Sequence, residues 1–312
     1  KKILVSTLLQ ALGFSKNDIV DEFYQKETLT YVKNLNKWKT KFDPENYKAK
    51  NFSEEVVDAK TGKVIIKLGD KVNYLNAKKL ANEGLKDILV SRESLFGKFL
   101  HQDIKVKDEE GGIFKIGTEL NDAIIQQILD ANINTIKISV TNSINKGPYI
   151  LTTILNDKNN NKDEAITEIY KMLRPGEPPT IEIATQIFNN LFFSSERYDL
   201  SDVGRVKMNS RLNLECSDKV TILRNDDILA IIHKMLDLRD GKDEVDDIDH
   251  LGNRRVRSVG ELVENQARIG VYRMERAIKE KMTTLDVESA MPQDLINAKP
   301  LTISLKDFFA TS

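Results

Sequence analysis

The run Asp246-Asp247-Ile248-Asp249-His250 is the clearest candidate in this sequence for residues that could do chemistry. It places three carboxylates and one imidazole within five residues. Magnesium usually takes one or two carboxylates together with phosphates, so the composition is compatible with a metal site. The alternative is an acidic loop that precedes a turn, and spacing alone does not separate the two.

Three arginines, Arg254, Arg255 and Arg257, follow this run and lie directly before Ser258. Ser258 and Glu261 predict a full capping box that opens a long helix to about Met282. Cations at a helix N-terminus are unfavourable because the macrodipole is positive there. The arginines therefore indicate either bound phosphates or carboxylates, or a structural network of salt bridges.

A proline-rich loop, Arg174-Pro175-Gly176-Glu177-Pro178-Pro179, is the third candidate. Its prolines reduce the conformational entropy of the chain, which suits a loop that presents Arg174 and Glu177 to a partner. A stiff connector between two helices is the alternative.

Absent motifs, charge balance and cysteine content exclude several classes of function. The sequence has no P-loop, no dinucleotide-binding glycine fingerprint, no HExxH and no GxSxG motif. Its 47 Lys and Arg against 48 Asp and Glu exclude a free-standing nucleic-acid binder held by bulk charge. One cysteine, Cys216, excludes an intrachain disulfide framework. No apolar run approaches the roughly 18 residues of a membrane span, and no signal-peptide pattern opens the chain. We therefore expect a cytosolic, excised fragment.

Helical signals flank a β-rich segment. Apolar spacing predicts two helices within residues 3–26, the first ended by Gly13 and the second opened by Ser15 with Asp18. Short β-rich runs follow at 28–32, 52–57, 64–68, 113–116 and 135–140, with turn signals at 60–63 and 109–112. After a turn signal at 145–148, helices are predicted at 163–173, from Thr180 to Phe192, and at 226–239, with a polar, low-complexity loop at 157–162.

The β-rich segment contains a repeat at an offset of 48 residues. Lys67-Leu68-Gly69 matches Lys115-Ile116-Gly117, Asn73 matches Asn121, and Ile88-x-Val90-Ser91 matches Ile136-x-Ile138-Ser139. Gly84 matches Asn132, and both residue types tolerate the left-handed conformation that ends a helix. Each repeat is predicted to be strand, turn, helix and strand. The expected fold is α+β: a helical and mixed base interrupted by a β-rich insertion with two such repeats, followed by a long C-terminal helix.

Seven motifs occur in an order that carries a resemblance to a known family. They are LRPGEPPT at 173–180, NLFF at 190–193, RYDL at 197–200, VGR at 203–205, EVDDIDHLGNRR at 244–255, SVGEL at 258–262 and MPQDLINAKP at 291–300. This succession resembles the beta subunit of bacterial DNA-directed RNA polymerase. The resemblance implies a first part of the lobe at 1–26, a lineage-variable insertion at 27–146, a second part of the lobe at 147–245 and the returning part of the protrusion at 246–312. If 27–146 is inserted in this way, Glu27 and Gly147 should lie close together.

The resemblance also implies a function. The lobe and protrusion of this family form one wall of the DNA cleft, near downstream DNA and the non-template strand. In the family, the motif at 246–255 contributes to a pocket that reads a flipped-out guanine. Carried over by motif, the expected nucleic-acid-binding residues are Asp247, Ile248, Asp249 and Arg254, with Arg174 and Arg197 near the non-template strand. Arginine beside Asp249 would keep that carboxylate ionised.

The same resemblance sets expectations for partners and cofactors. The partners would be the beta-prime, alpha and omega subunits, a sigma factor and promoter or downstream DNA, with transcription regulators at the insertion and no membrane. The nucleotidyltransferase activity belongs to the whole cytoplasmic, nucleoid-associated enzyme, whose magnesium is bound by the beta-prime subunit. The fragment itself is expected to hold no cofactor and to be inactive. Two alternatives stay open: a regulator-binding module centred on the insertion, and a stand-alone metal-dependent enzyme that uses Asp246, Asp247 and Asp249.

Overall fold

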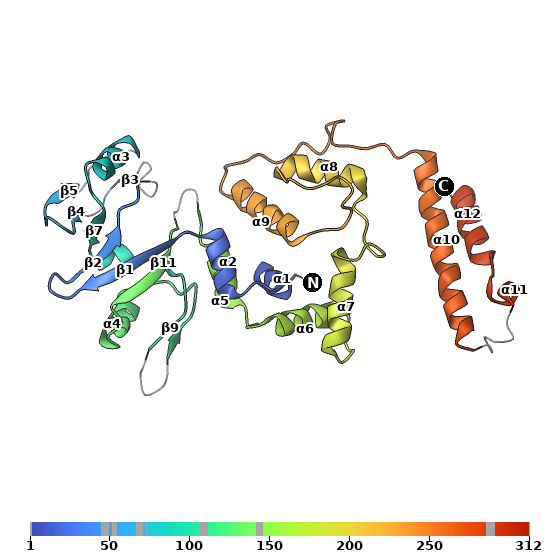
Figure 1. Cartoon of the computed structure of the whole chain (residues 1–312), viewed down its shortest axis with the longest axis horizontal. Coiled ribbons are helices and arrows are strands. Elements are labelled where there is room, and N and C mark those ends of the chain that lie inside the picture. The colour runs from blue at the N-terminus through green and yellow to red at the C-terminus, as the bar shows by residue number, and fades with distance from the viewer. Residues whose placement is uncertain are drawn as a thin grey trace. The chain divides into compact units, whose positions relative to one another are not determined.

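The computed structural model describes residues 2–44, 50–51, 55–66, 71–72, 74–106, 112–141, 146–284 and 291–311 (Figure 1). The chain divides into two compact units, Lys1–Glu244 and Val245–Ser312. Helices and antiparallel sheets make up the first unit and a long helix lies in the second, which confirms the predicted α+β class. No described helix is long and apolar enough to cross a membrane. The four-part division into lobe, insertion and protrusion remains a prediction.

The first two helices are positioned by local signals. They are α1 (Val5–Ala11) and α2 (Lys16–Phe23). Gly13 follows α1 with a φ of +105°, and the predicted capping box of α2 is present. The Asp18 amide donates to Ser15 Oγ at 3.2 Å, while the Ser15 amide donates to Asp18 Oδ2 at 2.9 Å. Both predictions for this region are confirmed.

A seven-stranded antiparallel sheet forms the centre of the β-rich segment. Its order is β5-β4-β7-β2-β1-β11-β8. Its strands are β1 (Lys26–Val32), β2 (Lys37–Lys41), β4 (Val56–Asp58), β5 (Val64–Ile66), β7 (Asp87–Val90), β8 (Phe99–Leu100) and β11 (Thr135–Ser139). Two small ladders add β3 (Lys50–Asn51) with β6 (Lys71–Val72), and β9 (Ile104–Lys105) with β10 (Ile113–Phe114). A short 3-10 helix spans Glu93–Leu95.

Each predicted run overlaps a strand of the structure, but the bounds differ: β1 begins at Lys26, before the run predicted at 28–32. The run predicted at 113–116 ends at Phe114, because Ile116 instead packs into the core of the helical base. The turn at 60–63 is confirmed by the Asp58 amide, which donates to the Lys63 carbonyl at 3.0 Å. Residues 52–54, 67–68, 109–111 and 145 of other predicted strands and turns lie outside the described residues. Strand β2 was not predicted.

The repeat is confirmed in its second half. Helices α3 (Tyr74–Asn82) and α4 (Asp122–Asp130) are offset by 48 residues at both ends. Gly84 and Asn132 follow them with left-handed φ values of +101° and +57°. The next amides repeat the same bond at 3.1 Å, Leu85 to the Leu80 carbonyl and Ile133 to the Ile128 carbonyl. The predicted first strand is not confirmed, because 115–117 form a turn and 67–69 and 73 lie outside the described residues.

Both repeat helices pack on one face of the sheet. Ile125 and Ile128 of α4 share a core with Trp38 and Ile136, and Ala77 of α3 shares a core with Ile88. The β2–β7 register places Trp38 opposite Val90 and Thr40 opposite Ile88, so these side chains lie on the same face. Strands β7 and β11 thus flank the central β1–β2 hairpin, each preceded by its own helix.

The two ends of the β-rich segment meet at the helical base. Lys26 pairs with Ser139, and Tyr24 Oη donates to the Gly147 carbonyl at 2.8 Å. Burial raises the pKa of the Tyr24 phenol to about 12, so the hydroxyl stays a donor. The predicted closeness of the segment's two ends is therefore confirmed. The contact with the base is also apolar, because Ile116 and Phe99 pack beside Leu151.

Replacing residues 27–146 with a short Gly/Ser linker should leave a folded remainder, because the ends already lie together. The melting temperature should fall, since Ile116 and Phe99 leave the core that contains Leu151. Thermal unfolding followed by circular dichroism, with the full chain as control, measures both effects. Loss of the cooperative transition would show that the helical base needs the segment in order to fold.

Five further helices complete the first unit. They are α5 (Tyr149–Asn156), α6 (Lys162–Leu173), α7 (Ile181–Phe192), α8 (Ser201–Leu212) and α9 (Asn225–Arg239). Helices α6, α7 and α9 confirm the predictions, whereas α5 and α8 were not predicted. Thr180 occupies the N-cap position of α7, but its side chain makes no capping bond.

Two side chains of the polar loop after α5, Asp157 and Asn159, are buried, whereas its other residues are exposed. Asp157 is only 5% exposed. Its Oδ2 accepts from Ser6 Oγ at 2.5 Å and from Gln10 Nε2 at 3.0 Å, and its Oδ1 accepts from the Asn159 amide at 2.9 Å. The loop therefore fastens α1 to α6 through a buried carboxylate that the sequence does not distinguish from a surface one.

The second unit is built on two long helices, with a short helix between them in the sequence. It contains α10 (Val259–Met282), α11 (Pro292–Leu295) and α12 (Lys299–Thr311). Helices α10 and α12 approach closely at Gly270, where an added Cβ would lie 2.7 Å from Leu301 Cα. The predicted end of α10 at Met282 is confirmed, and α12 was not predicted.

Candidate nucleic-acid interface

The loop at residues 246–257 is organised by Asp247. Asp247 Oδ1 accepts from the Asp249 amide at 3.0 Å, and the Asp247 carbonyl accepts from Asn253 Nδ2 at 2.7 Å. His250 Nδ1 accepts from the Gly252 amide at 3.0 Å, and the Asn253 amide donates to the His250 carbonyl at 2.8 Å. The loop is thus folded by side chain to backbone bonds rather than by a core.

This arrangement leaves the Asp249 carboxylate exposed. It makes no hydrogen bond or ion pair with the other residues that the structure describes. Ile248 beside it is 78% exposed, and Leu251 is 86% exposed. The loop therefore combines an acceptor-only group with apolar side chains, which suits an aromatic base that carries N–H donors on its edge.

The arginines after the loop divide into two kinds. Arg255 forms an ion pair with Glu261 in the first turn of α10. Because that carboxylate is engaged, the predicted full capping box is only half present: Ser258 Oγ accepts from the Glu261 amide at 3.4 Å, and the return bond is absent. The salt-bridge alternative therefore holds for Arg255. Arg254 and Arg257 form no ion pair within the described part of the chain.

The two other predicted arginines belong to the first unit. Arg174 Nη1 lies 3.3 Å from Glu177 Oε2, which also accepts from Tyr170 Oη at 2.9 Å. The hydrogen bond from Tyr170, and then that from Arg174, lowers the pKa of the Glu177 carboxyl. The rigid loop thus pairs its own two charges. The Arg197 amide donates to the Ser194 carbonyl at 3.0 Å in the turn after α7.

The structure therefore brings four of the six predicted residues together. Asp247, Ile248, Asp249 and Arg254 share one exposed loop of the second unit. Asp249 and Arg254 are not joined by an ion pair there, so the expected partnership between them is absent from the described contacts. Arg174 and Arg197 lie on separate turns of the first unit.

The metal-site interpretation of the acidic run gains no support. Across the ranges that the structure describes, no group of three or more His, Cys, Asp or Glu side chains is arranged to hold a metal ion. Asp247 serves the backbone of its loop instead.

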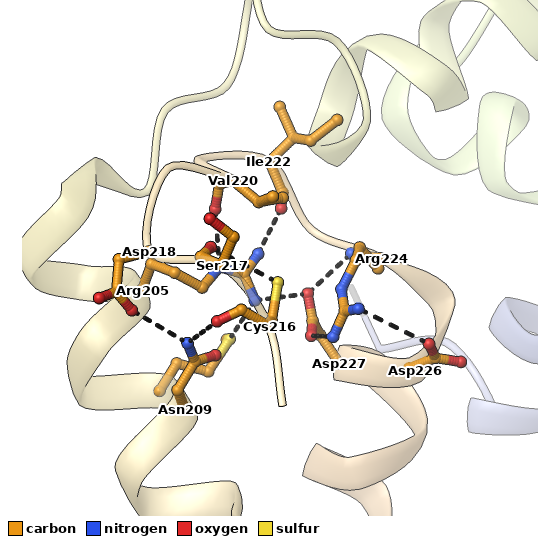
Figure 2. A network of polar contacts seen from close by, with 11 residues as sticks. Arg205, Asn209, Cys216, Ser217, Asp218, Val220, Ile222, Arg224, Asp226 and Asp227 are labelled. Atoms are coloured by element: carbon orange, nitrogen blue, oxygen red, sulfur yellow. Dashed lines mark hydrogen bonds and ion pairs between the residues drawn. The ribbon is translucent and has the colours of Figure 1, made fainter. Parts of the chain in front are cut away.

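A buried polar network in the first unit was missed by sequence reasoning (Figure 2). Arg205 of α8 and Asp227 of α9 are both fully buried, and Arg205 Nη1 lies 2.8 Å from Asp227 Oδ2. Arg205 Nε also donates to the Val220 carbonyl at 2.7 Å, and Nη2 donates to the Ile222 carbonyl. The guanidinium therefore fastens the loop between α8 and α9 to both helices. No feature of the sequence distinguishes Arg205 from an exposed arginine.

A second group that sequence reasoning missed has the Ser-His-Asp arrangement of a catalytic triad. His101 Nδ1 lies 2.9 Å from Ser139 Oγ, and His101 Nε2 lies 3.1 Å from Asp21 Oδ1. Ser139 is only 1% exposed, so no substrate could reach its hydroxyl. The group joins the sheet to α2 and is structural.

Comparison with known proteins finds relatives that align with the whole chain. Residues 132–257 match the family model described as RNA polymerase Rpb2, domain 2. The chain is 46% identical over 324 residues to the DNA-directed RNA polymerase subunit beta of Jannaschia sp. (strain CCS1), and 47% identical over 324 residues to that of Dinoroseobacter shibae. It is 46% identical over 312 residues to that of Rickettsia felis. These alignments cover 100% of the chain, the segment 27–146 included, and 23% of each relative. The chain thus spans about a quarter of the length of these relatives.

Proposed function

Because the chain belongs over its full length to the family of DNA-directed RNA polymerase beta subunits, we propose that it forms part of the wall of the DNA cleft and contacts the non-template strand through the loop at 246–257. The observation that carries the proposal is the exposed Asp249 carboxylate, which has no partner among the described residues. A carboxylate that faces DNA is repelled by phosphates, so its placement needs a base with donors.

The proposed base is an unstacked guanine. Guanine presents two neighbouring donors on its Watson–Crick edge, which both oxygens of Asp249 could accept. Ile248 would cover the face of the flipped base, and Arg254 would contact a flanking phosphate. Asp247 would act through the backbone of the loop, which it already holds in shape.

The polymerisation chemistry is proposed for the whole enzyme only. The described residues offer no group that fits a catalytic magnesium, so no chemical step is assigned to this chain. Within the assembly, the chain would contact the beta-prime, alpha and omega subunits, a sigma factor and DNA, in the cytoplasm near the nucleoid. Arg174 and Arg197 are proposed as further contacts to the non-template strand.

Photo-cross-linking tests this placement directly. A photo-reactive amino acid at Ile248, in a whole polymerase assembled on promoter DNA, should cross-link to the non-template strand. The matched control is Leu75 of α3, an apolar side chain that is 68% exposed. Cross-linking of position 248 to protein only, or equally to both DNA strands, would contradict the proposal.

A second function is favoured by the way the β-rich segment joins the base. The segment leaves and returns at one point, between Tyr24 and Gly147, and builds its own cores on α3 and α4. Such an attached module can bind a transcription regulator without disturbing the cleft. Capture of a defined regulator by the whole subunit, and its loss on deletion of 27–146, would support this function.

A further inference from the structure

On the central strands β2, β1 and β11, one face is open to solvent around Thr28 and Thr30, whereas at its end Ser139 is buried and joined to α2 through His101. Leu29, Trp38, Ile136 and Ile138 lie on the face that packs against α4. The alternate residues of the three central strands lie on the opposite face. We call it the lysine-threonine face, and its residues are Thr28, Thr30, Lys37, Lys39, Lys41, Thr135 and Lys137.

The strand register assembles this face from three strands. Thr28 of β1 pairs with Lys137 of β11, and Thr30 pairs with Thr135 on one side and with Lys39 on the other. Exposure alternates along β1 and β2, with Leu29 and Trp38 fully buried and their neighbours open to solvent. On these three strands the exposed part of the face is therefore polar, although Leu89 of β7, which pairs with Lys39, is buried on the same side.

Its charge is sorted, although the chain as a whole has a net charge of −1. Asp87 of β7 is the acid in register with this face, opposite Lys41, and it lies 2.9 Å from Lys39 Nζ. Lys37, Lys41 and Lys137 form no ion pair with other described residues. Three ammonium groups on this face are thus available to an anionic partner.

The regular spacing of the lysines suits a regular polyanion. Lys37, Lys39 and Lys41 occupy alternate positions of one strand, so their Cα atoms recur about every 7 Å. A DNA strand also carries its phosphates at regular intervals, one per about 3.4 Å of helix axis, so a row of evenly spaced lysines can meet more than one phosphate of the same strand. Threonine hydroxyls between the lysines are phosphate donors.

We propose that the lysine-threonine face binds the phosphate backbone of duplex DNA, as a contact separate from the loop at 246–257. The inference rests on the proposed function only in that DNA is the polyanion present in such an enzyme. The contact carries no sequence information, because phosphates are the same in every sequence.

The experiment removes three charges from the face in the whole polymerase. Lys37→Gln, Lys41→Gln and Lys137→Gln together keep most of each side chain and remove its charge. Each lost phosphate contact lowers the slope of log affinity against log salt by about 0.9, so the slope should fall by about 2–3. Between about 50 and 200 mM salt, wild type should therefore lose roughly 40-fold more affinity for a promoter duplex than the variant loses.

The matched control removes the same charge from the other side of the segment. Lys78, Lys79 and Lys86 are exposed on α3 and on the chain that follows it, and their triple Gln variant should keep the wild-type slope. Equal slopes for the two triple variants, or an unchanged slope in the first, would overturn the proposal. So would a photo-reactive residue at Thr30 that cross-links to polypeptide and not to DNA.

The same preparations separate this proposal from the function of the loop. The Lys37, Lys41 and Lys137 variant should keep the dependence on a non-template guanine that Asp249 is proposed to provide. A salt slope unchanged from wild type in this variant, with guanine dependence intact, would sink only the proposal for the lysine-threonine face. A lowered salt slope in the triple variant, together with a wild-type enzyme that does not depend on the non-template guanine, would sink only the loop's proposed role.

Discussion

Replacing Arg205 with methionine should lower the free energy of unfolding by about 3–5 kcal/mol. The substitution leaves the fully buried Asp227 carboxylate with Arg224 as its remaining cation and leaves the carbonyls of Val220 and Ile222 without their donor. Burying unpaired charge and acceptors costs far more than the pair itself contributes. Urea unfolding followed by circular dichroism measures the difference.

Arg211 on the same helix is the matched control. Its guanidinium is partly exposed and lies 3.4 Å from Asp243. Arg211→Met should therefore cost about 1 kcal/mol or less, as exposed ion pairs do. Equal losses for the two variants would contradict the structural role that the buried network gives to Arg205.

The same network gives a pH dependence with a defined sign. Burial by itself would raise the pKa of Asp227, but hydrogen bonds from Arg224 and Arg205 outweigh it and hold the pKa below the ordinary 3.8. A depressed carboxyl pKa stabilises the fold above the unfolded-state value. That stability is lost as the pH falls from about 4 through the lowered pKa, so Arg205→Met should flatten the acid limb of the stability curve.

Local signals explain which elements the sequence could predict. Ser15 with Asp18 opens α2, and Gly84 and Asn132 end the two repeat helices, because caps depend on residues within one turn. Strand β2 was missed although Lys37-Trp38-Lys39-Thr40-Lys41 alternates with period two, because its lysines obscured the buried Trp38. Strands of two residues, such as β8, exist only through tertiary pairing and leave no pattern to read.

Less of the candidate site than of the fold could be predicted from the sequence alone. The sequence shows acids followed by arginines just before α10. From this order we expected a carboxylate to pair with one of the arginines, and the ion pair between Arg255 and Glu261 confirms it. The base-reading role proposed for Asp249 rests only on the resemblance, because no spacing rule describes such a pocket. Arg205 could not have been found, since burial of a charged side chain depends on the arrangement of α8, α9 and their loop.

Replacing Asp249 with alanine should remove guanine recognition without unfolding the loop. The carboxylate makes no bond to the described residues, whereas the loop backbone is held by Asp247. The loss should be about 1–3 kcal/mol for guanine, by analogy with a good base-edge pair, and close to zero for the other bases. Asp247→Ala, which removes the bond that orders the loop, should weaken binding for all four bases alike.

The most direct test of the proposed function compares open-complex lifetimes of whole polymerases on four promoters that differ only at the recognised non-template base. Wild type should hold the guanine promoter about 5- to 150-fold longer than the others, which is the same 1–3 kcal/mol expressed as a lifetime. In the Asp249→Ala enzyme the four lifetimes should become equal, at the level that wild type shows for the other bases. An equal change on all four promoters would mean that Asp249 is structural and that the loop does not read guanine.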